Sequence, residues 1–368
     1  MARDNARDVN ARLRYGIPAA VLVLVSVGAV FVAARTDPSH IGGSSSGPQE
    51  LDAGKPAGPL DGATGWINSP PLAPADLAGK VVVYDFWTYS CINCVRTIPY
   101  LRAWYDRYAR DGLVIVGVHS PEFDFEHKRA NVEAATQRLG VTWPVVLDND
   151  KAIWTTFRNA YWPAKYVADR DGNIRYKHYG EGAYGETEDT LRALLGVDPA
   201  SPRAGAPGEG PTADPAPDDS HRITPETYLG VTRGTARAAP GLITYPEPAV
   251  PATHQVRLAG RWFGEEEKVT AGDAGAAIVL SYRASEVNIV MTPPRGDAVD
   301  VQVELDGAPL RPGFRTDDTT VDDSGATFIH VDHDGLYRVV LGPGVEEHLL
   351  RLTARQPEVA AFAFTFGP

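Results

Sequence analysis

Two hydrophobic patterns alternate in the first half of the chain. Residues 81–87 and 113–118 are continuous apolar runs of strand length, as expected for strands buried on both faces of a sheet. Between them, apolar side chains recur every three or four residues from Val95 to Tyr108, which predicts a helix that begins near Cys91. A strand, a helix and a strand in this order predict a βαβ unit with a parallel sheet.

Further patterns of the same kind extend this α/β domain, which we place at residues 60–197. They predict a helix at 126–139, ending at Gly140, and strands at 144–147, 164–168 and 174–179. The turn that joins the last two strands is predicted at residues 169–172, where Asp-Arg-Asp-Gly stands.

After residue 222 the pattern changes to short runs in which apolar and polar residues alternate. Residues 299–305 alternate strictly and end at an Asp-Gly turn. Similar runs occur at 278–282, 287–291, 327–331, 336–341, 348–352 and 359–366. We therefore expect an all-β sandwich, jelly-roll-like, over residues 223–368.

The N-terminus carries a segment of membrane character. Residues 17–34 form an apolar run without a charge, and a helix of this length reaches about 27 Å, close to the hydrocarbon thickness of a bilayer. Residues 1–16 hold four arginines, so they predict a cytoplasmic tail, with everything after the run outside the cytoplasm. The alternative is a cleaved signal peptide, because small residues at 32–34 suit cleavage, and the chain would then be secreted.

Two stretches rich in Pro, Gly, Ser and Ala separate these parts. Residues 35–59 predict a flexible linker, and residues 198–222 predict a Pro-rich linker between the two domains. A chain of 368 residues with 43% hydrophobic content is long enough for two cores. Its net charge of −12 offers no electrostatic footprint for nucleic acid, which we exclude as a partner.

Cys91 and Cys94 are the only cysteines of the chain. A zinc site needs four ligands, and no second cysteine pair or histidine pair stands near enough to complete one. A structural disulfide is the other alternative, but so short a loop restricts the unfolded chain little. A CxxC between a buried strand and a helix is typical of a redox pair. The helix start favours the thiolate of Cys91 as the nucleophile, and Cys94, one turn later, can resolve the mixed disulfide.

Residues 84–94, YDFWTYSCINC, followed by Pro99, resemble the thioredoxin superfamily. The extracytoplasmic anchor, the insertion at residues 119–143 and the sequence Tyr161-Trp162-Pro163 are similar to the TlpA/ResA group. The greatest resemblance is to the soluble C-terminal region of DipZ-type proteins, where a similar motif precedes a β-sandwich related to carbohydrate-binding modules. Those proteins have a multi-spanning membrane domain, whereas this sequence holds one apolar run, so we expect a separate membrane electron donor such as a CcdA-like protein.

The resemblance also implies roles for individual residues. Pro163 matches the cis-proline beside the Cys91–Cys94 disulfide, where the backbone of Trp162 meets an extended substrate. Asp85 matches the buried acid beneath the second cysteine, a general acid/base for Cys94. The glutamate that follows the CxxC in some ResA-like proteins is replaced by Thr97.

Several other side chains have a functional and a structural interpretation. Trp87 and Tyr89 are candidates for an apolar rim around the substrate, although aromatic residues on a strand more often pack in the core. Glu122 and Glu126 are expected to be solvated residues at a helix start, with partner choice as the alternative. Trp262 and Phe263 either stack on a sugar or pack in the core. Six aspartates of the second domain are candidates for calcium binding, with ordinary loop positions as the alternative; they are Asp317, Asp318, Asp322, Asp323, Asp332 and Asp334.

Together these observations predict a membrane-anchored, extracytoplasmic thiol-disulfide oxidoreductase that acts on disulfides of client proteins. We expect no cofactor and no metal. The dipeptide Ile92-Asn93 holds no histidine, which favours the reducing direction. The alternatives are a binding protein whose β-sandwich takes a glycan or a partner, with the CxxC domain as a spacer, and a thiol peroxidase.

Overall fold

The computed structural model describes residues 57–204, 223–236, 238–295 and 297–368. The predicted tail (1–16) and apolar segment (17–34) lie outside this part, as do residues 35–56 of the first linker and 205–222 of the second. None of the helices within the described ranges has the length and apolar character needed to cross a membrane. The predicted anchor therefore stays a prediction.

Residues 57–204 form a mixed six-stranded sheet. Its strands are β1 (Gly65–Ile67), β2 (Val81–Trp87), β3 (Leu113–His119), β4 (Val145–Leu147), β5 (Ala164–Ala168) and β6 (Ile174–Tyr179). They lie in the order β1-β4-β3-β2-β5-β6, in which β2, β3 and β4 are parallel and the other three are antiparallel to their neighbours. Because α2 (Ile92–Tyr108) connects β2 to β3, the predicted βαβ unit is confirmed.

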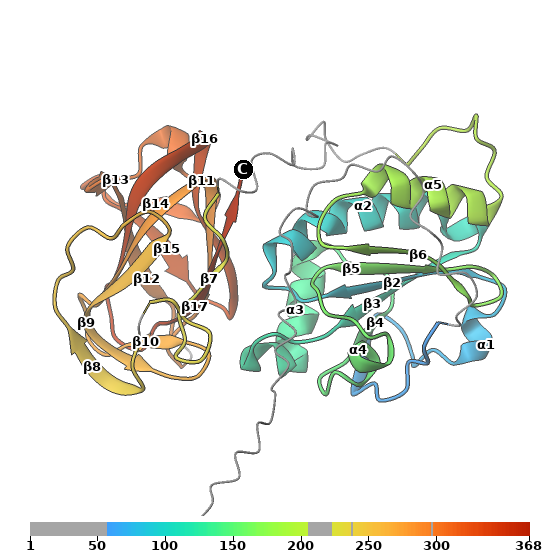
Figure 1. Ribbon diagram of the computed structural model, residues 1–368, viewed down its shortest axis with the longest axis horizontal. Coiled ribbons are helices and arrows are strands. Elements are labelled where there is room, and N and C mark those ends of the chain that lie inside the picture. Colours follow the sequence, from blue (N-terminus) through green and yellow to red (C-terminus); the bar gives the residue numbers. More distant parts are fainter. Residues whose placement is uncertain (1–56, 205–222, 237, 296) are drawn as a thin grey trace, which may run out of the picture. The chain divides into compact units, whose positions relative to one another are not determined.

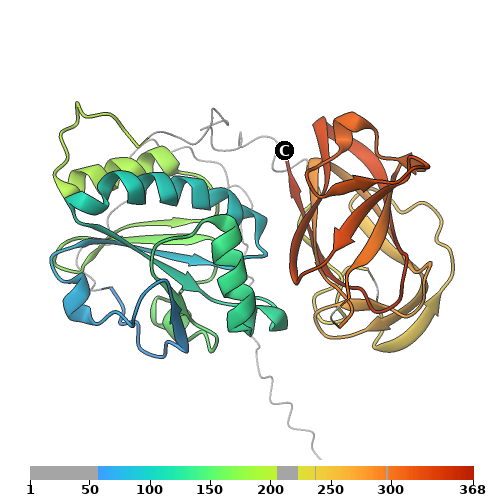
Figure 2. The same cartoon turned by 180° about the vertical axis from the view of Figure 1, so that it is seen from behind.

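Helices cover both faces of this sheet (Figures 1 and 2). Besides α2 they are α1 (Pro74–Leu77), α3 (Arg129–Leu139), α4 (Ala152–Thr156) and α5 (Tyr184–Leu195). Leu101 of α2 and Leu191 of α5 share one apolar core with Val83 of β2, whereas Ile153 of α4 packs with Val82 in a second core. Alternate residues of β2 thus enter different cores, which explains why six of its seven residues are apolar or aromatic and all seven are buried.

The helix predicted at residues 126–139 begins later than expected. Asp124–His127 forms a 3₁₀ turn, Lys128 is extended, and α3 begins at Arg129. The Glu126 side chain accepts a hydrogen bond from the Phe123 backbone and so caps the 3₁₀ turn instead of continuing α3. The predicted end is correct, because Gly140 adopts the left-handed conformation (φ 64°) that closes the helix.

Residues 198–204, predicted as the start of the second linker, contact α5. The Arg192 guanidinium on α5 donates hydrogen bonds of 2.9–3.2 Å to carbonyl oxygens of residues between Asp198 and Pro202. The backbone N–H of Ala204 donates a hydrogen bond to the Glu188 side-chain carboxylate at 2.7 Å. Residues 198–204 therefore belong to the α/β domain, because a buried arginine needs these carbonyls as partners.

The described residues from 223 onward contain strands and only one short 3₁₀ turn, Pro312–Phe314. The strands are β7 (Thr227–Tyr228), β8 (Gly241–Tyr245), β9 (Gln255–Gly264), β10 (Val269–Ala271), β11 (Ala277–Thr292), β12 (Val299–Leu305), β13 (Ala308–Pro309), β14 (Thr319–Val321), β15 (Thr327–Val331), β16 (Gly335–Ala354) and β17 (Ala360–Gly367). The predicted all-β class is confirmed, while the jelly-roll topology stays a prediction.

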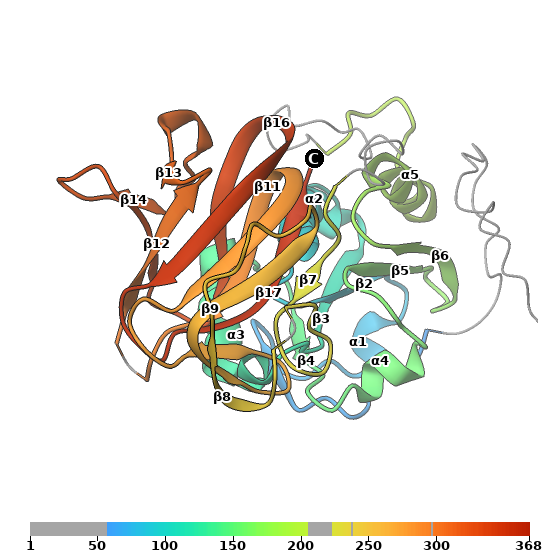
Figure 3. The same cartoon turned by 60° about the vertical axis from the view of Figure 1, so that its left-hand side comes forward.

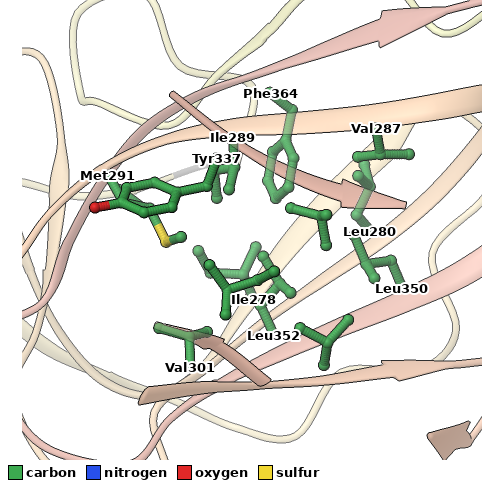
Figure 4. Close-up of a cluster of buried hydrophobic side chains, with 14 of the residues drawn as sticks. Ile278, Leu280, Val287, Ile289, Met291, Val301, Tyr337, Leu350, Leu352 and Phe364 are labelled. Atoms are coloured by element: carbon green, nitrogen blue, oxygen red, sulfur yellow. The ribbon is translucent and has the colours of Figure 1, made fainter. Parts of the chain in front are cut away.

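Two long strands, β11 and β16, replace four of the predicted short ones (Figure 3). The first part of β11 pairs with β9 and the second part pairs with β17, and a register shift between Ala284 and Glu286 separates them. Such an irregularity bends a strand, so one strand can belong to two layers. Side chains from both parts of β11, including Ile278 and Ile289, meet in one apolar core with Phe364 of β17 (Figure 4).

Candidate active site

The cysteine pair lies at the start of α2. Cys91 is the N-cap residue and is partly exposed, whereas Cys94, in the first turn, is buried. The backbone N–H of Cys94 donates a hydrogen bond to Sγ of Cys91 at 3.4 Å. Both cysteines are free thiols in this structure, so the predicted Cys91–Cys94 disulfide stays a prediction. The arrangement gives one accessible thiol that a helix N-terminus can stabilise as a thiolate.

Asp85 is a buried carboxyl group on β2 beside this pair. Burial raises its pKa to about 7, and the positive charge of Lys165 opposes the shift. Its Oδ1 accepts no hydrogen bond from any described residue. Burial also raises the pKa of the Cys94 thiol, and the interactions with Cys91 and Asp85 raise it further. A carboxyl group that titrates near neutral pH can exchange a proton with such a thiol.

Lys165 is a site residue that the sequence analysis missed. It is buried on β5 directly across from Asp85, as its partner in the antiparallel ladder. Its Nζ lies 5.5 Å from the centre of the Tyr184 ring, and its charge lowers the pKa of both Asp85 and Glu181 against the larger effect of burial. The signal was available, because a lysine inside a short, otherwise apolar strand needs a buried partner.

The Trp162–Pro163 peptide bond is cis, as the resemblance implies. The indole N–H of Trp162 donates a hydrogen bond to the carbonyl of Ser120 at 3.0 Å. The ring of Trp162 packs on Trp154, with the ring centres 4.3 Å apart. The backbone N–H of Gly180 donates to the Pro163 carbonyl at 2.7 Å. The Trp162 side chain is therefore fixed to the loop after β3, and its role toward a substrate stays a prediction.

The predicted substrate rim of Trp87 and Tyr89 is wrong for this structure. The two side chains expose only 1% and 2% of their surface. His119 packs between them, edge-on to Trp87 and stacked on Tyr89, and Tyr89 also contacts Phe125. These aromatic rings form part of the core beneath the active-site loop, because removing apolar surface from water stabilises the fold more than leaving it exposed at the rim.

The expectation of a solvated Glu126 is also wrong. This side chain is fully buried and accepts hydrogen bonds from the hydroxyls of Thr88 and Ser90, which lie in the loop that leads into Cys91. Burial raises the pKa of Glu126, and these bonds oppose the shift. Glu122, by contrast, is half-buried. Burial lowers the pKa of the neighbouring His119 to about 3, so its imidazole is neutral at physiological pH.

The two aromatic residues considered for sugar stacking differ in exposure. Trp262 is 3% exposed and donates its indole N–H to the Ala259 carbonyl, so it is a core residue. Phe263 on the same strand exposes 45% of its surface.

Among the acidic residues considered for calcium, Asp322 accepts hydrogen bonds from Ser324 and Ala326 within its own turn.

Two family models match the chain. The model described as the AhpC/TSA family matches residues 69–177, and the one described as a thioredoxin-like C-terminal domain matches residues 224–367. A solved structure of a thioredoxin-like protein in the oxidised form is 27% identical and covers 40% of this chain and 96% of its own, with a TM-score of 0.36.

Some curated relatives match most of the chain, and others match a shorter part of it. The DipZ proteins of Mycobacterium bovis and Mycobacterium tuberculosis are each 35% identical over 337 residues, which is 89% of this chain and 45% of theirs. The thiol-disulfide oxidoreductase YkuV of Bacillus subtilis is 29% identical over 141 residues, 38% of this chain and 95% of YkuV. The chain thus spans about half the length of the DipZ proteins that it matches.

Proposed function

We propose that this chain, a TlpA/ResA/DipZ-like member of the thioredoxin superfamily, reduces disulfides of extracytoplasmic client proteins with Cys91 and Cys94. The observation that carries the proposal is the asymmetry of the pair. Cys91 is accessible at a helix start, whereas Cys94 is buried beside a carboxyl group whose pKa burial raises to about 7. An attacking and a resolving thiol need these two environments.

The exchange proceeds in two steps. The Cys91 thiolate attacks one sulfur of the client disulfide, so that a mixed disulfide forms and the other client sulfur leaves as a thiolate. Cys94 then gives its proton to Asp85 and attacks the Cys91 sulfur. The second client thiolate leaves, the Cys91–Cys94 disulfide forms, and the client has gained the two electrons that the cysteine pair has lost.

Location and electron supply complete the proposal. The apolar residues 17–34, preceded by arginines, favour a single membrane anchor with a cytoplasmic N-terminus and an extracytoplasmic remainder. A membrane donor of the CcdA-like kind would then return the pair to its dithiol form. The reducing direction rests on the dipeptide Ile92-Asn93, which has no histidine to stabilise the thiolate further. We assign binding of a partner or a glycan to the β region, where Phe263 is exposed.

Trapping of mixed disulfides tests the proposed function. The variant Cys94→Ser should accumulate client proteins linked through Cys91, and the matched variant Cys91→Ser should accumulate none. Equal trapping by both variants would contradict the assignment of the two thiols. Faster reaction of Cys91 with peroxide than with disulfides would identify a thiol peroxidase instead, and unchanged function of Cys91→Ser in cells would favour a binding protein.

A further inference from the structure

One carboxylate connects the active-site loop to the loop that follows β3. The Oε1 atom of Glu126 accepts hydrogen bonds from the hydroxyls of Thr88 and Ser90, the latter at 2.6 Å. Its Oε2 atom accepts backbone N–H bonds from Glu122 at 2.6 Å and from Phe123 at 3.0 Å. Four donors from two separate loops therefore converge on one side chain.

The burial of Glu126 makes these four bonds obligatory. The residue has no exposed surface, so water cannot replace a lost partner. Hydrogen bonds to a carboxylate are shorter and roughly twice as strong as those between neutral groups. Opening either loop would leave a buried charge with only half of its donors. The two loops are thus held together by an interaction that is costly to break.

The residues held in this way lead directly into Cys91. The backbone N–H of Cys91 points to the Thr88 carbonyl at 3.4 Å, and Ser90 is its sequence neighbour. Tyr89 lies between the two hydroxyl donors, buried against His119 and Phe125. The ends of β2 and β3 are also adjacent, since Trp87 pairs with His119. The position of the Cys91 sulfur therefore depends on how firmly residues 88–90 are held.

We propose that Glu126 is a positioning residue for thiol-disulfide exchange, which holds the loop at residues 88–90 in the conformation that presents Cys91 to a client disulfide. The expected effect on the rate of disulfide exchange rests on the proposed function, whereas the expected effect on the conformation of residues 88–90 does not. Glu126 touches neither cysteine in the contacts described, so it acts through Thr88 and Ser90. Small displacements of a reacting atom are sufficient to slow a reaction roughly a hundredfold.

Three variants of the full chain test this inference. Glutamine can keep all four bonds, because its carbonyl oxygen accepts both backbone N–H groups while its amide donates to the hydroxyls. We therefore expect Glu126→Gln to stay close to the wild type and Glu126→Ala to lose roughly ten- to a hundredfold in kcat/KM with a protein disulfide. Glu133→Ala removes a half-exposed glutamate on α3 and serves as the control. Amide hydrogen exchange at residues 88–91 should accelerate only in Glu126→Ala.

The outcomes separate the inference from the proposed function. The inference would be overturned if a folded Glu126→Ala variant kept both the wild-type amide protection at residues 88–91 and the wild-type kcat/KM. It would also be overturned if Glu126→Gln were impaired as much as Glu126→Ala, because that result would indicate a role of the charge. If Glu126→Ala does not fold, Ser90→Ala removes one donor alone, and unchanged hydrogen exchange at residues 88–91 would then overturn it. A wild-type chain without disulfide reductase activity would refute the proposed function, while the hydrogen exchange would still decide on the positioning role.

Discussion

Replacement of Asp85 by Asn should remove a pH-dependent cost to stability. Burial raises the pKa of Asp85 from 3.8 to about 7, so the folded chain keeps a proton that the unfolded chain releases between these values. Because the folded pKa lies above the unfolded one, stability falls as the pH rises through this window, by roughly 4 kcal/mol in all. Asparagine has no charge to bury, so Asp85→Asn should be spared this loss.

Urea unfolding of the reduced full chain, followed by tryptophan fluorescence, measures the effect. Between about pH 5 and about pH 8, the free energy of unfolding of Asp85→Asn should gain roughly 2 to 3 kcal/mol relative to the wild type. The matched control Asp106→Asn alters an exposed carboxylate on α2 and should show no such gain. A stability difference between Asp85→Asn and the wild type that is the same at both pH values would refute the reasoning.

Three further predictions concern the charge beside Asp85, the core and the linker. Lys165→Met should raise the pKa of Asp85 further and move the pH profile of disulfide exchange upward; an unmoved profile would contradict the coupling. Leu101→Ala, at a fully buried position of α2, should lower the free energy of unfolding by about 2 to 5 kcal/mol in urea titrations, and a negligible loss would argue against tight packing there. Limited digestion should cut first within residues 205–222 and leave reductase activity only in the fragment with Cys91; activity in the other fragment would contradict this.

The elements that hold the cysteine pair could be predicted from the sequence alone. A largely apolar run of strand length marks β2, and apolar residues at three- and four-residue spacing mark α2, because both patterns follow from backbone geometry within a few residues. The place of Cys91 at the start of that helix follows from the same local pattern. The all-β character of the second half is local as well, since alternation along a strand needs no knowledge of its neighbours.

Only the tertiary structure decided which polar side chains are buried around the site. Glu126 has the local sequence of a helix start, but its burial depends on Thr88 and Ser90, which stand 38 and 36 positions earlier in the chain. Lys165 likewise becomes a site residue because the ladder between β2 and β5 places it across from Asp85. A charged group can be buried only where distant segments supply its partners, and local periodicity carries no information about those partners.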